Sequence, residues 1–372
     1  MAESMKISAA VARAKNTPFT LETLSLDEPR FDEVLVRLVA TGICHTDISM
    51  RDHKIYPIPH PVVLGHEGAG IVERVGAGVT KVKAGDHVIL ASNSCGHCPS
   101  CVEGMPVYCY DFNAYNFSGS RPDGTSPLSK NGEKIHYFHA QSTFANYSVT
   151  RERSVVKVNK DAPLELLGPL GCGVMTGAGA VINSMAVGVG HSIAVFGTGS
   201  VGLSAIMAAK LVGAGIIIAV DLVESRLALA RELGATHAVN PDKESTIEAI
   251  KKITGAGVNF TLDTTGNMKV LRQAMDVLAP RGTCGFVGGA PEGAAVTINV
   301  EQIMVGGRTI RGIIEGDSNP EVFLPKLIEL YMLGRFPFDK LVKFYPFEEI
   351  NTAVDDALSG RTVKPILRFP TA

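Results

Sequence analysis

The stretch Ile193-Ala194-Val195-Phe196-Gly197-Thr198-Gly199-Ser200-Val201-Gly202 decides how the second half of this chain folds. Four apolar residues typical of a buried strand run into three glycines with the spacing G-x-G-x-x-G, and a helix-like segment follows. Gly197 permits a tight turn, Gly199 lets the backbone approach a pyrophosphate, and Gly202 allows the next helix to pack closely. The N-terminus of that helix, which includes Ser200 and Val201, offers amide protons and partial positive charge to phosphate groups.

A second apolar run, 216–220, ends in Asp221, nineteen residues after Gly202. A carboxylate at this place accepts hydrogen bonds from ribose hydroxyls and repels a 2′-phosphate, so the sequence predicts binding of NAD rather than NADP. Arg226 is a second candidate for ribose contact, although a solvated helical arginine fits the same position. The alternative for the whole motif is a glycine turn in an ordinary α/β sheet, with Asp221 as a helix cap.

Strand-like and helix-like runs alternate from about residue 192 onward. The strand-like runs are 193–196, 216–220, 260–263 and 282–287, and the helix-like runs between them are 201–212, 225–233 and 268–278. This alternation predicts a parallel sheet built from β-α-β units. Residues up to about 150 are instead typical of short strands and turns, and the tail is expected to hold helices at 321–333 and 348–358 and a strand at 365–369.

The stretch 166–209 contains no Asp, Glu, Lys or Arg and is long enough to cross a membrane. Glycines and residues such as Pro169, Asn183 and His191 divide it into short elements. Parallel strands that are covered on both faces produce such uncharged runs in α/β cores. We therefore expect no membrane helix here.

Four cysteines, Cys95, Cys98, Cys101 and Cys109, form the pattern C-x2-C-x2-C-x7-C in a loop rich in Gly and Pro. Thiolates at this spacing can converge on one metal ion, and four sulfurs give Zn²⁺ a closed structural site. The alternatives are ordinary or disulfide-bonded cysteines and a redox-active pair, which this spacing suits less well. The chemistry is therefore expected elsewhere in the chain.

Cys44, His66 and Cys172 are candidates for a second metal site. Two thiolates and one imidazole leave a fourth zinc position open, as expected of a catalytic site. Spacing alone does not join residues so far apart. A buried cysteine, a capping histidine and a core cysteine are the alternatives.

The composition describes a soluble globular protein of about two domains. The chain has 372 residues, 45% of them hydrophobic, and a formal net charge of −2 without Lys/Arg runs, so no nucleic-acid partner is expected. Six of the seven cysteines fall in candidate metal sites, and Cys284 is predicted to be a buried core thiol. Cysteine usage and an N-terminus without signal-peptide features lead us to expect a reducing, cytoplasmic location.

A longer motif adds a family resemblance. Residues 65–79 match G-H-E-x2-G-x5-G-x2-V through Gly65, His66, Glu67, Gly70, Gly76 and Val79. With the four-cysteine loop, the glycine turn and Leu170–Gly173, the sequence resembles the zinc-dependent medium-chain dehydrogenase/reductase family, the alcohol dehydrogenases, over essentially its whole length. Within that family it is most similar to the bacterial aryl-alcohol (benzyl alcohol) dehydrogenases and their terpene-alcohol relatives, a likeness carried by 44–47, 165–173, 220–226 and 336–344.

The resemblance implies an α/β fold of two domains. Residues 1–173 and 312–372 would form a GroES-like β catalytic domain, and 174–311 a Rossmann domain with a doubly wound parallel sheet. The family forms dimers and tetramers, so a homo-oligomer is expected. The implied reaction is reversible oxidation of a primary, aromatic or allylic, alcohol to the aldehyde, with hydride transfer to NAD. Glutathione-dependent formaldehyde oxidation and a non-enzymatic dinucleotide-binding relative are the alternatives.

The resemblance also implies roles for individual residues and two zinc ions per chain. Cys44, His66 and Cys172 would bind the catalytic zinc, with Glu67 nearby and Asp47 orienting His66, a usual arrangement beside zinc-bound imidazole. Thr46 would hydrogen-bond the substrate oxygen. Without the resemblance, Glu67 and Asp47 are equally well interpreted as surface charges. The alternative for Thr46 is an ordinary loop threonine with a satisfied backbone contact.

Further residues match family positions at the cofactor and the substrate. His45 and Lys364 would contact phosphates, Thr176 would lie near the nicotinamide amide, and Val287 is a further cofactor candidate; a solvated lysine is the alternative for Lys364. The proton relay of many relatives ends at a histidine where this chain has Ser49, and His45 and His53 are the nearest replacements. The apolar cleft is expected to draw its lining from Phe112, Tyr115, Phe117, Tyr137 and Phe138, with core packing as the alternative for each.

Overall fold

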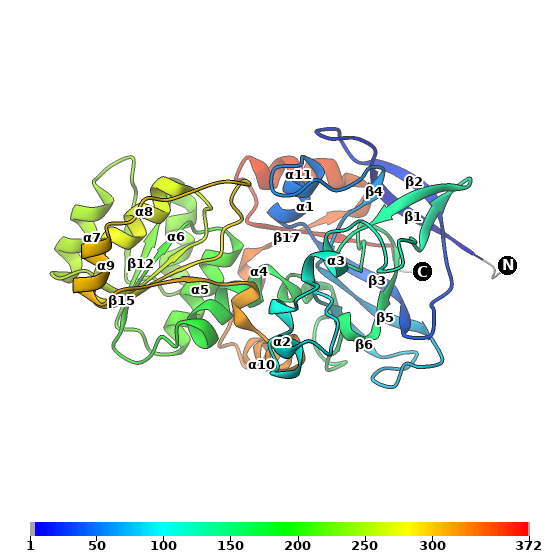
Figure 1. Cartoon of the computed structure of the whole chain (residues 1–372), viewed down its shortest axis with the longest axis horizontal. Helices are drawn as coiled ribbons and strands as arrows, with labels where there is room; N and C mark the ends of the chain where they lie inside the picture. Colours follow the sequence, from blue (N-terminus) through cyan, green and yellow to red (C-terminus); the bar gives the residue numbers. More distant parts are fainter. Residues whose placement is uncertain (1–3, 371–372) are drawn as a thin grey trace. The chain divides into compact units, whose positions relative to one another are not determined.

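A computed structural model of the chain describes residues 4–370. The chain divides into two compact units (Figure 1). The first holds the chain through Cys172 together with Asn319–Met332 and the C-terminal part from Asp339. The second holds Gly173–Ser318 and Leu333–Phe338. The C-terminal strand therefore returns to the unit in which the chain begins.

The first unit is built on two β structures. A closed barrel follows the order β1-β2-β7-β8-β4, with strands β1 (Met5–Ala12), β2 (Thr20–Leu26), β4 (Val62–Val63), β7 (Leu128–Lys130) and β8 (Glu133–Tyr137). The second sheet follows the order β10-β6-β5-β3-β18-β17, with β9 pairing to β3. Its strands are β3 (Glu33–Gly42), β5 (Gly68–Val75), β6 (His87–Leu90), β9 (Tyr147–Arg151), β10 (Val155–Lys157), β17 (Val342–Pro346) and β18 (Lys364–Arg368).

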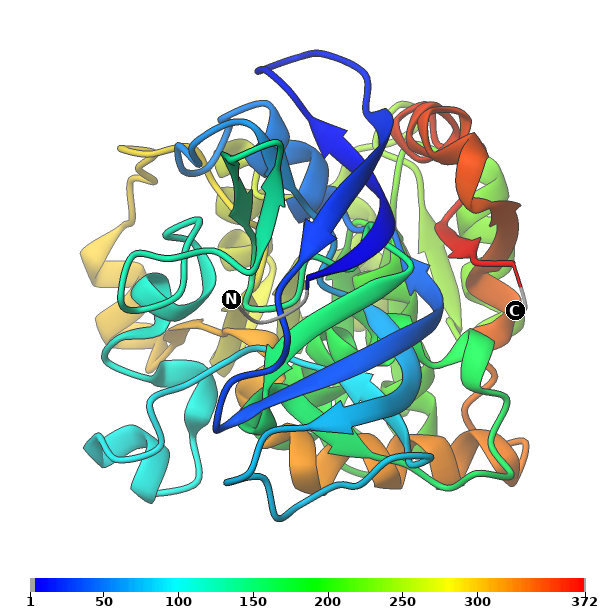
Figure 2. The same cartoon turned by 90° about the vertical axis from the view of Figure 1, so that its right-hand side faces the viewer.

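The register of β18 explains how the tail completes this unit. β18 pairs antiparallel with β3, with Ile366 opposite Gly42. The blue, cyan and green strands of this unit face the viewer in Figure 2. The helices are α1 (His45–Arg51), α2 (Pro99–Val102), α3 (Phe112–Asn116), α10 (Pro320–Met332) and α11 (Ile350–Leu358). The expected tail helices and strand are confirmed with ends shifted by one or two residues.

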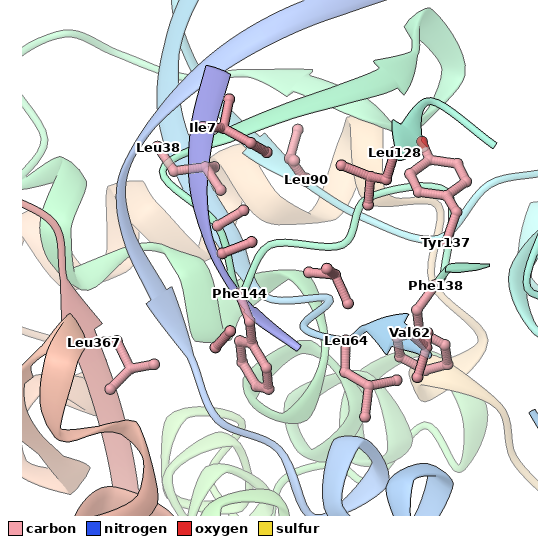
Figure 3. Close-up of a cluster of buried hydrophobic side chains, with 14 of the residues drawn as sticks. Ile7, Leu38, Val62, Leu64, Leu90, Leu128, Tyr137, Phe138, Phe144 and Leu367 are labelled. Atoms are coloured by element: carbon pink, nitrogen blue, oxygen red, sulfur yellow. The ribbon is translucent and has the colours of Figure 1, made fainter. Parts of the chain in front are cut away.

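One buried apolar cluster fills the barrel and reaches the second sheet (Figure 3). Phe144, Leu64 and Val62 lie in it with no exposed surface, and the rings of Phe144 and Phe19 meet edge to face at 5.5 Å between centroids. Burial of each such side chain contributes about 1.5–3 kcal/mol to folding. This cluster gives the candidate site in the first unit a rigid support.

The second unit contains one parallel sheet in the order β13-β12-β11-β14-β15-β16. The strands are β11 (Ser192–Phe196), β12 (Ile216–Val220), β13 (His237–Val239), β14 (Val258–Asp263), β15 (Leu278–Phe286) and β16 (Thr309–Gly312). The helices are α4 (Gly173–Gly179), α5 (Ser200–Leu211), α6 (Glu224–Leu233), α7 (Thr246–Thr254), α8 (Met268–Asp276) and α9 (Val300–Gly306). The strand order reverses direction beside β11, so the predicted doubly wound sheet is confirmed.

The uncharged stretch 166–209 contains a 3-10 helix (Gly168–Gly171), α4, a π-helical segment (Ala180–Ser184), β11 and most of α5. Ile193–Phe196 and most of α5 are buried, as expected of a strand and helix in the core of an α/β sheet. Among the described residues, the structure contains no helix with the length and apolar character needed to span a membrane. Cys284 is fully buried in β15, which confirms the predicted core thiol.

Candidate active site

The glycine turn connects β11 to α5 in the second unit. Gly197 has φ +86°, a left-handed conformation that favours glycine. A Cβ on Gly202 would stand 1.9 Å from the carbonyl oxygen of Gly197, so a larger residue would break the turn. A Cβ on Gly199 would meet nothing within 4 Å, which leaves open space over the start of α5. The turn is therefore a cradle in which a phosphate group fits.

Asp221 follows β12 and faces the same turn. Its Oδ2 accepts hydrogen bonds from the backbone N–H of Thr198 at 2.6 Å and from Thr198 Oγ1 at 2.8 Å, and its Oδ1 accepts from the N–H of Val223 at 2.9 Å. The N-cap residue of α6 is Val223, so the alternative of Asp221 as a helix cap is wrong. Arg226 is half-buried in the first turn of α6.

Asp221 also lines a cavity of about 320 Å³ beside the glycine turn. The lining residues are Phe196, Gly197, Val220, Asp221, Leu222, Pro241, Thr265, Asn267, Val270 and Gln273. Apolar side chains predominate, with a carboxylate at one side. Such a lining suits the flat adenine ring and the polar ribose of a dinucleotide.

The four cysteines of the loop converge in the first unit. The sulfurs of Cys95, Cys98, Cys101 and Cys109 all lie within 4.8 Å of one another. Cys95 Sγ and Cys101 Sγ are 3.9 Å apart, too far for a disulfide bond, and all seven cysteines of the chain are free. The disulfide alternative is therefore wrong. A hydrogen bond from the backbone N–H of Tyr110 lowers the pKa of the Cys98 thiol to about 6.

Three residues distant in sequence form the second cluster. Cys44 is the N-cap residue of α1, His66 lies between β4 and β5, and Cys172 ends a short turn after β10. Cys44 Sγ and Cys172 Sγ are 3.9 Å apart, and His66 Nε2 is 3.2 Å from Cys172 Sγ. With Glu67, these atoms lie within 4.8 Å of one another. The alternative of three unrelated core residues is wrong.

Asp47 connects Cys44 and His66 through hydrogen bonds. Its Oδ1 lies 2.7 Å from His66 Nδ1 and accepts a hydrogen bond from the N–H of Gly65 at 3.1 Å, and its Oδ2 accepts from the N–H of Cys44 at 3.0 Å. Burial acts to lower the pKa of His66, but Asp47 outweighs it and the pKa lies well above the ordinary value. The hydrogen bond with Cys172 holds the pKa of Cys44 well below its usual range.

Glu67 and Lys364 form a buried ion pair beside the same cluster. Lys364 Nζ lies 2.9 and 3.0 Å from the two carboxylate oxygens of Glu67 and donates to the carbonyl oxygen of Ile43 at 3.2 Å. Both side chains are almost fully buried. Burial raises the pKa of Glu67 although Lys364 opposes the shift. A surface position for Glu67, Asp47 or Lys364 is therefore wrong, while the phosphate contact of Lys364 stays a prediction.

The remaining predicted residues occupy both units. Thr46 is half-buried and His45 exposed in the first turn of α1, and Ser49 is buried in the same helix. His53 Nε2 lies 2.9 Å from the carbonyl oxygen of Ile58, and its ring packs against that of His60. In the second unit, Thr176 is buried in α4, and Val287 follows β15 and donates its N–H to the carbonyl oxygen of Asp263.

The five predicted cleft aromatics separate into two groups. Tyr137 is core, since its hydroxyl donates to the carbonyl oxygen of Val149, and Tyr115 packs on the four-cysteine cluster under the guanidinium of Arg151. The rings of Phe112, Phe117 and Phe138 form a connected set beside His66, although Phe138 is also a fully buried member of the apolar cluster and Phe112 also packs on the cysteines. The centroid of Phe138 lies 5.7 Å from that of His66, and Phe117 lies 6.0 Å from Phe138 and 5.9 Å from Phe112.

His139 belongs to this aromatic set and was not predicted from the sequence. Its ring lies 4.9 Å from that of His66 and 5.6 Å from that of Phe117. Burial, assisted by the charge of His66, lowers the pKa of His139 well below its ordinary value. The only signal in the sequence was its place directly after two aromatic residues, which does not separate a site residue from a core residue.

Known proteins resemble the chain in both parts. The alcohol dehydrogenase GroES-like domain matches residues 30–160, and the zinc-binding dehydrogenase domain matches residues 200–331. The chain is 44% identical over 364 residues to geraniol dehydrogenase of Castellaniella defragrans, and the match covers 97% of each chain. The predicted family and the GroES-like part of the fold are thereby confirmed, and the alternative functions are not favoured.

Solved structures give the same result. The benzyl alcohol dehydrogenase of Acinetobacter calcoaceticus is 49% identical, with a TM-score of 0.96 over 98% of this chain and 100% of that one. An alcohol dehydrogenase zinc-binding domain protein of Burkholderia ambifaria is 55% identical, with a TM-score of 0.97 over 99% of this chain and 100% of that one. The chain therefore belongs to the zinc-binding alcohol dehydrogenase family, and it is an enzyme that oxidises an alcohol with zinc and NAD as its cofactors.

Proposed function

We propose that this enzyme oxidises primary aromatic or allylic alcohols to aldehydes, reversibly, with hydride transfer to NAD. The observation that carries the proposal is the convergence of Cys44, His66 and Cys172 beside a set of aromatic rings. Flat aromatic walls favour flat, apolar substrates over a two-carbon alcohol. The names of two relatives, geraniol dehydrogenase and benzyl alcohol dehydrogenase, describe an allylic and an aromatic alcohol.

Cys44, His66 and Cys172 are the residues that would hold the catalytic zinc. Two sulfurs and one imidazole nitrogen at mutual contact are the donor set that leaves zinc a free position. When bound there, zinc acts as a Lewis acid toward the alcohol oxygen. Asp47 keeps the Nδ1 of His66 hydrogen-bonded and so directs Nε2 toward the cysteines. Thr46, two residues after Cys44, would hydrogen-bond the substrate oxygen and start the proton transfer, passing on its own hydroxyl proton as it accepts that of the alcohol.

The four-cysteine cluster would hold the structural zinc. All four donors are sulfurs, and four thiolates leave the ion no position for a substrate. The backbone amides of Cys95 and Cys98 already donate hydrogen bonds to cysteine sulfurs, which stabilises negative charge on them. The ion would therefore fix the loop that carries α2 and precedes α3.

The glycine turn and Asp221 would bind the pyrophosphate and the adenosine ribose of NAD. Gly197, Gly199, Ser200, Val201 and Gly202 supply the turn and the first amides of α5. The two oxygens of Asp221 already accept backbone hydrogen bonds, so the carboxylate is fixed in orientation before the ribose arrives. The contacts of His45, Thr176, Arg226, Val287 and Lys364 with the cofactor belong to the same proposal.

We further propose that the first compact unit is the GroES-like catalytic domain and the second the Rossmann domain. The second unit extends past the predicted boundary at 311 to Ser318, because Asp317 and Ser318 contact Arg311 and Asn183 within it. A cytoplasmic location is part of the proposal, supported by free cysteines in two metal-binding patterns. Recovery of the protein in an exported or membrane fraction would contradict that location.

The substrate proposal predicts a large difference between alcohols. We expect kcat/KM for benzyl alcohol and geraniol to exceed that for ethanol by about 100-fold or more, because each buried apolar group adds on the order of 1 kcal/mol or more to binding in the transition state. NADH formation at saturating NAD measures it. Equal values for benzyl alcohol and ethanol would contradict the proposal, as would turnover of S-hydroxymethylglutathione in preference to both.

The zinc proposal predicts that Asp47→Asn loses the catalytic metal. Asparagine has one acceptor oxygen where Asp47 uses two, so the amide cannot keep all three hydrogen bonds and zinc affinity should fall about 10–100-fold. Zinc content after dialysis against a chelator should drop from about two ions per chain to about one, because the four-cysteine site is untouched. Asp52→Asn, just beyond the other end of α1, is the matched control and should keep both ions. Retention of both ions by Asp47→Asn would refute the orienting role.

The cofactor proposal predicts that Asp221→Ser admits NADP. Removing the carboxylate removes its repulsion of a 2′-phosphate, so the kcat/KM ratio of NADP to NAD should rise at least about tenfold. Asp242→Asn changes an exposed carboxylate outside the cavity and should leave the ratio as it is. An unchanged ratio in Asp221→Ser would mean that another residue selects the cofactor.

The oligomer proposal predicts a contact at one edge of the second unit. We propose that the homo-oligomer forms through β16, an edge strand, and the neighbouring α9, whose Val300, Met304 and Val305 are 69–75% exposed. Met304→Glu combined with Val305→Glu should lower the mass measured by light scattering at least by half. Val189→Glu, which alters an equally exposed residue elsewhere, is the control. Unchanged mass in the double variant would place the interface elsewhere.

A further inference from the structure

His139 is held in place by its backbone. The residue follows β8 with φ +55°, a left-handed conformation that is uncommon outside glycine. Its N–H donates to the carbonyl oxygen of Asn116 at 2.8 Å, and only 4% of its surface is exposed. A conformation of this kind persists only where the surroundings enforce it. Burial and contact with the ring of His66 also restrict the side chain of His139.

The imidazole of His139 is surrounded by rings. Centroid distances are 4.9 Å to His66, 5.5 Å to Phe138, 5.6 Å to Phe117 and 6.3 Å to Phe112. His66 is one of the proposed catalytic zinc ligands, and the three phenylalanines form the proposed substrate wall. His139 is thus the polar member of an otherwise apolar set of rings that contacts His66, a proposed zinc ligand.

One nitrogen of this imidazole lacks a partner. Among the residues that the structure describes, Nδ1 of His139 is buried and makes no hydrogen bond. The corresponding Nδ1 atoms of two nearby histidines do have partners. His136 Nδ1 pairs with the carbonyl oxygen of Gly119, and His66 Nδ1 pairs with Asp47. Two other histidines, His60 and His87, also have an unpartnered buried nitrogen, but neither makes a ring contact with His66. An unpartnered buried nitrogen costs about 1–3 kcal/mol, and a bound ligand can remove that cost.

We infer that His139 determines specificity by hydrogen-bonding a polar substituent on the aromatic ring of the substrate, such as a phenolic hydroxyl group. The inference rests on the proposed function and narrows its substrate class to hydroxylated benzyl alcohols. An imidazole nitrogen pairs with a hydroxyl group as donor or as acceptor, while the phenylalanines contact the ring faces. A hydrocarbon ring leaves the nitrogen unpaired, so the site discriminates against it.

Matched substrate pairs test the inference. For the ortho, meta and para isomers, kcat/KM of the hydroxybenzyl alcohol is divided by that of the methylbenzyl alcohol, which has nearly the same volume. We expect the wild-type ratio for at least one isomer to exceed that of His139→Leu by about tenfold or more, since the variant removes the hydrogen bond and keeps an apolar side chain. Comparing ratios between the two enzymes cancels the intrinsic reactivity of each alcohol.

Two controls separate recognition from structural damage. His136→Leu, three residues earlier in β8, should keep the wild-type ratios, and both variants should keep about two zinc ions per chain. If His139→Leu fails to fold, His139→Phe retains a ring of similar size without the nitrogen and should show the same loss. Calorimetric dissociation constants of hydroxybenzamide and methylbenzamide, which the enzyme cannot oxidise as alcohols, should differ in the wild type and converge in the variant.

The outcomes distinguish this inference from the proposed function. Equal ratios in the wild type and the His139 variants, with benzyl alcohol still preferred to ethanol, would overturn the inference alone. Failure of every benzyl alcohol to exceed ethanol would overturn the proposed function. A hydroxyl preference that is lost in the His139 variants and kept in His136→Leu supports the inference.

Discussion

The cluster of Cys44, His66 and Cys172, the proposed catalytic site, depends on a single carboxylate, that of Asp47. It accepts hydrogen bonds from the backbone of Cys44, the backbone of Gly65 and the ring of His66, so one side chain ties the start of α1 to the turn between β4 and β5. Because the carboxylate is fully buried, the loss of any one of these donors leaves part of its charge uncompensated in the protein interior. Two of the three proposed zinc ligands, Cys44 and His66, are thus brought together by the protein's own hydrogen bonds.

Charge balance imposes the second constraint on this site. Two cysteine thiols and Glu67 place up to three negative charges in the interior, and the ammonium of Lys364 is the buried cation that pairs with Glu67. The position of the Glu67 carboxylate requires glycine at position 42, because a Cβ on Gly42 would stand 2.0 Å from Glu67 Oε2. Lys364 reaches Glu67 from β18, which pairs with β3. The C-terminal strand therefore contributes to the electrostatics of the proposed zinc site as well as to the sheet.

The sequence predicted what local patterns encode and failed where tertiary contacts decide. The strand, glycine turn and acid around Gly197 and Asp221 are local, so the parallel sheet and the cofactor cradle could be inferred from spacing. The partner of Lys364 could not, because Glu67 lies 297 positions away. The run of Tyr137, Phe138 and His139 does not indicate which ring faces the core. The alternation of inward and outward side chains ends with β8 at Tyr137, and the backbone of His139 is left-handed.

The four-cysteine loop and the aromatic rings beside His66 are connected through α3, so a metal at the four cysteines, as proposed, would also affect the position of these rings. Asn116, the last residue of α3, makes this connection. Its Oδ1 accepts a hydrogen bond from the backbone N–H of Asn93, and its Nδ2 donates one to the carbonyl oxygen of Asn93. Asn93 lies two residues before Cys95. The carbonyl oxygen of Asn116 accepts the N–H of His139. At the other end of α3, Phe112 packs on the cysteines. Because both ends of a five-residue helix are fixed this way, disorder in the cysteine loop would release the aromatic wall as well.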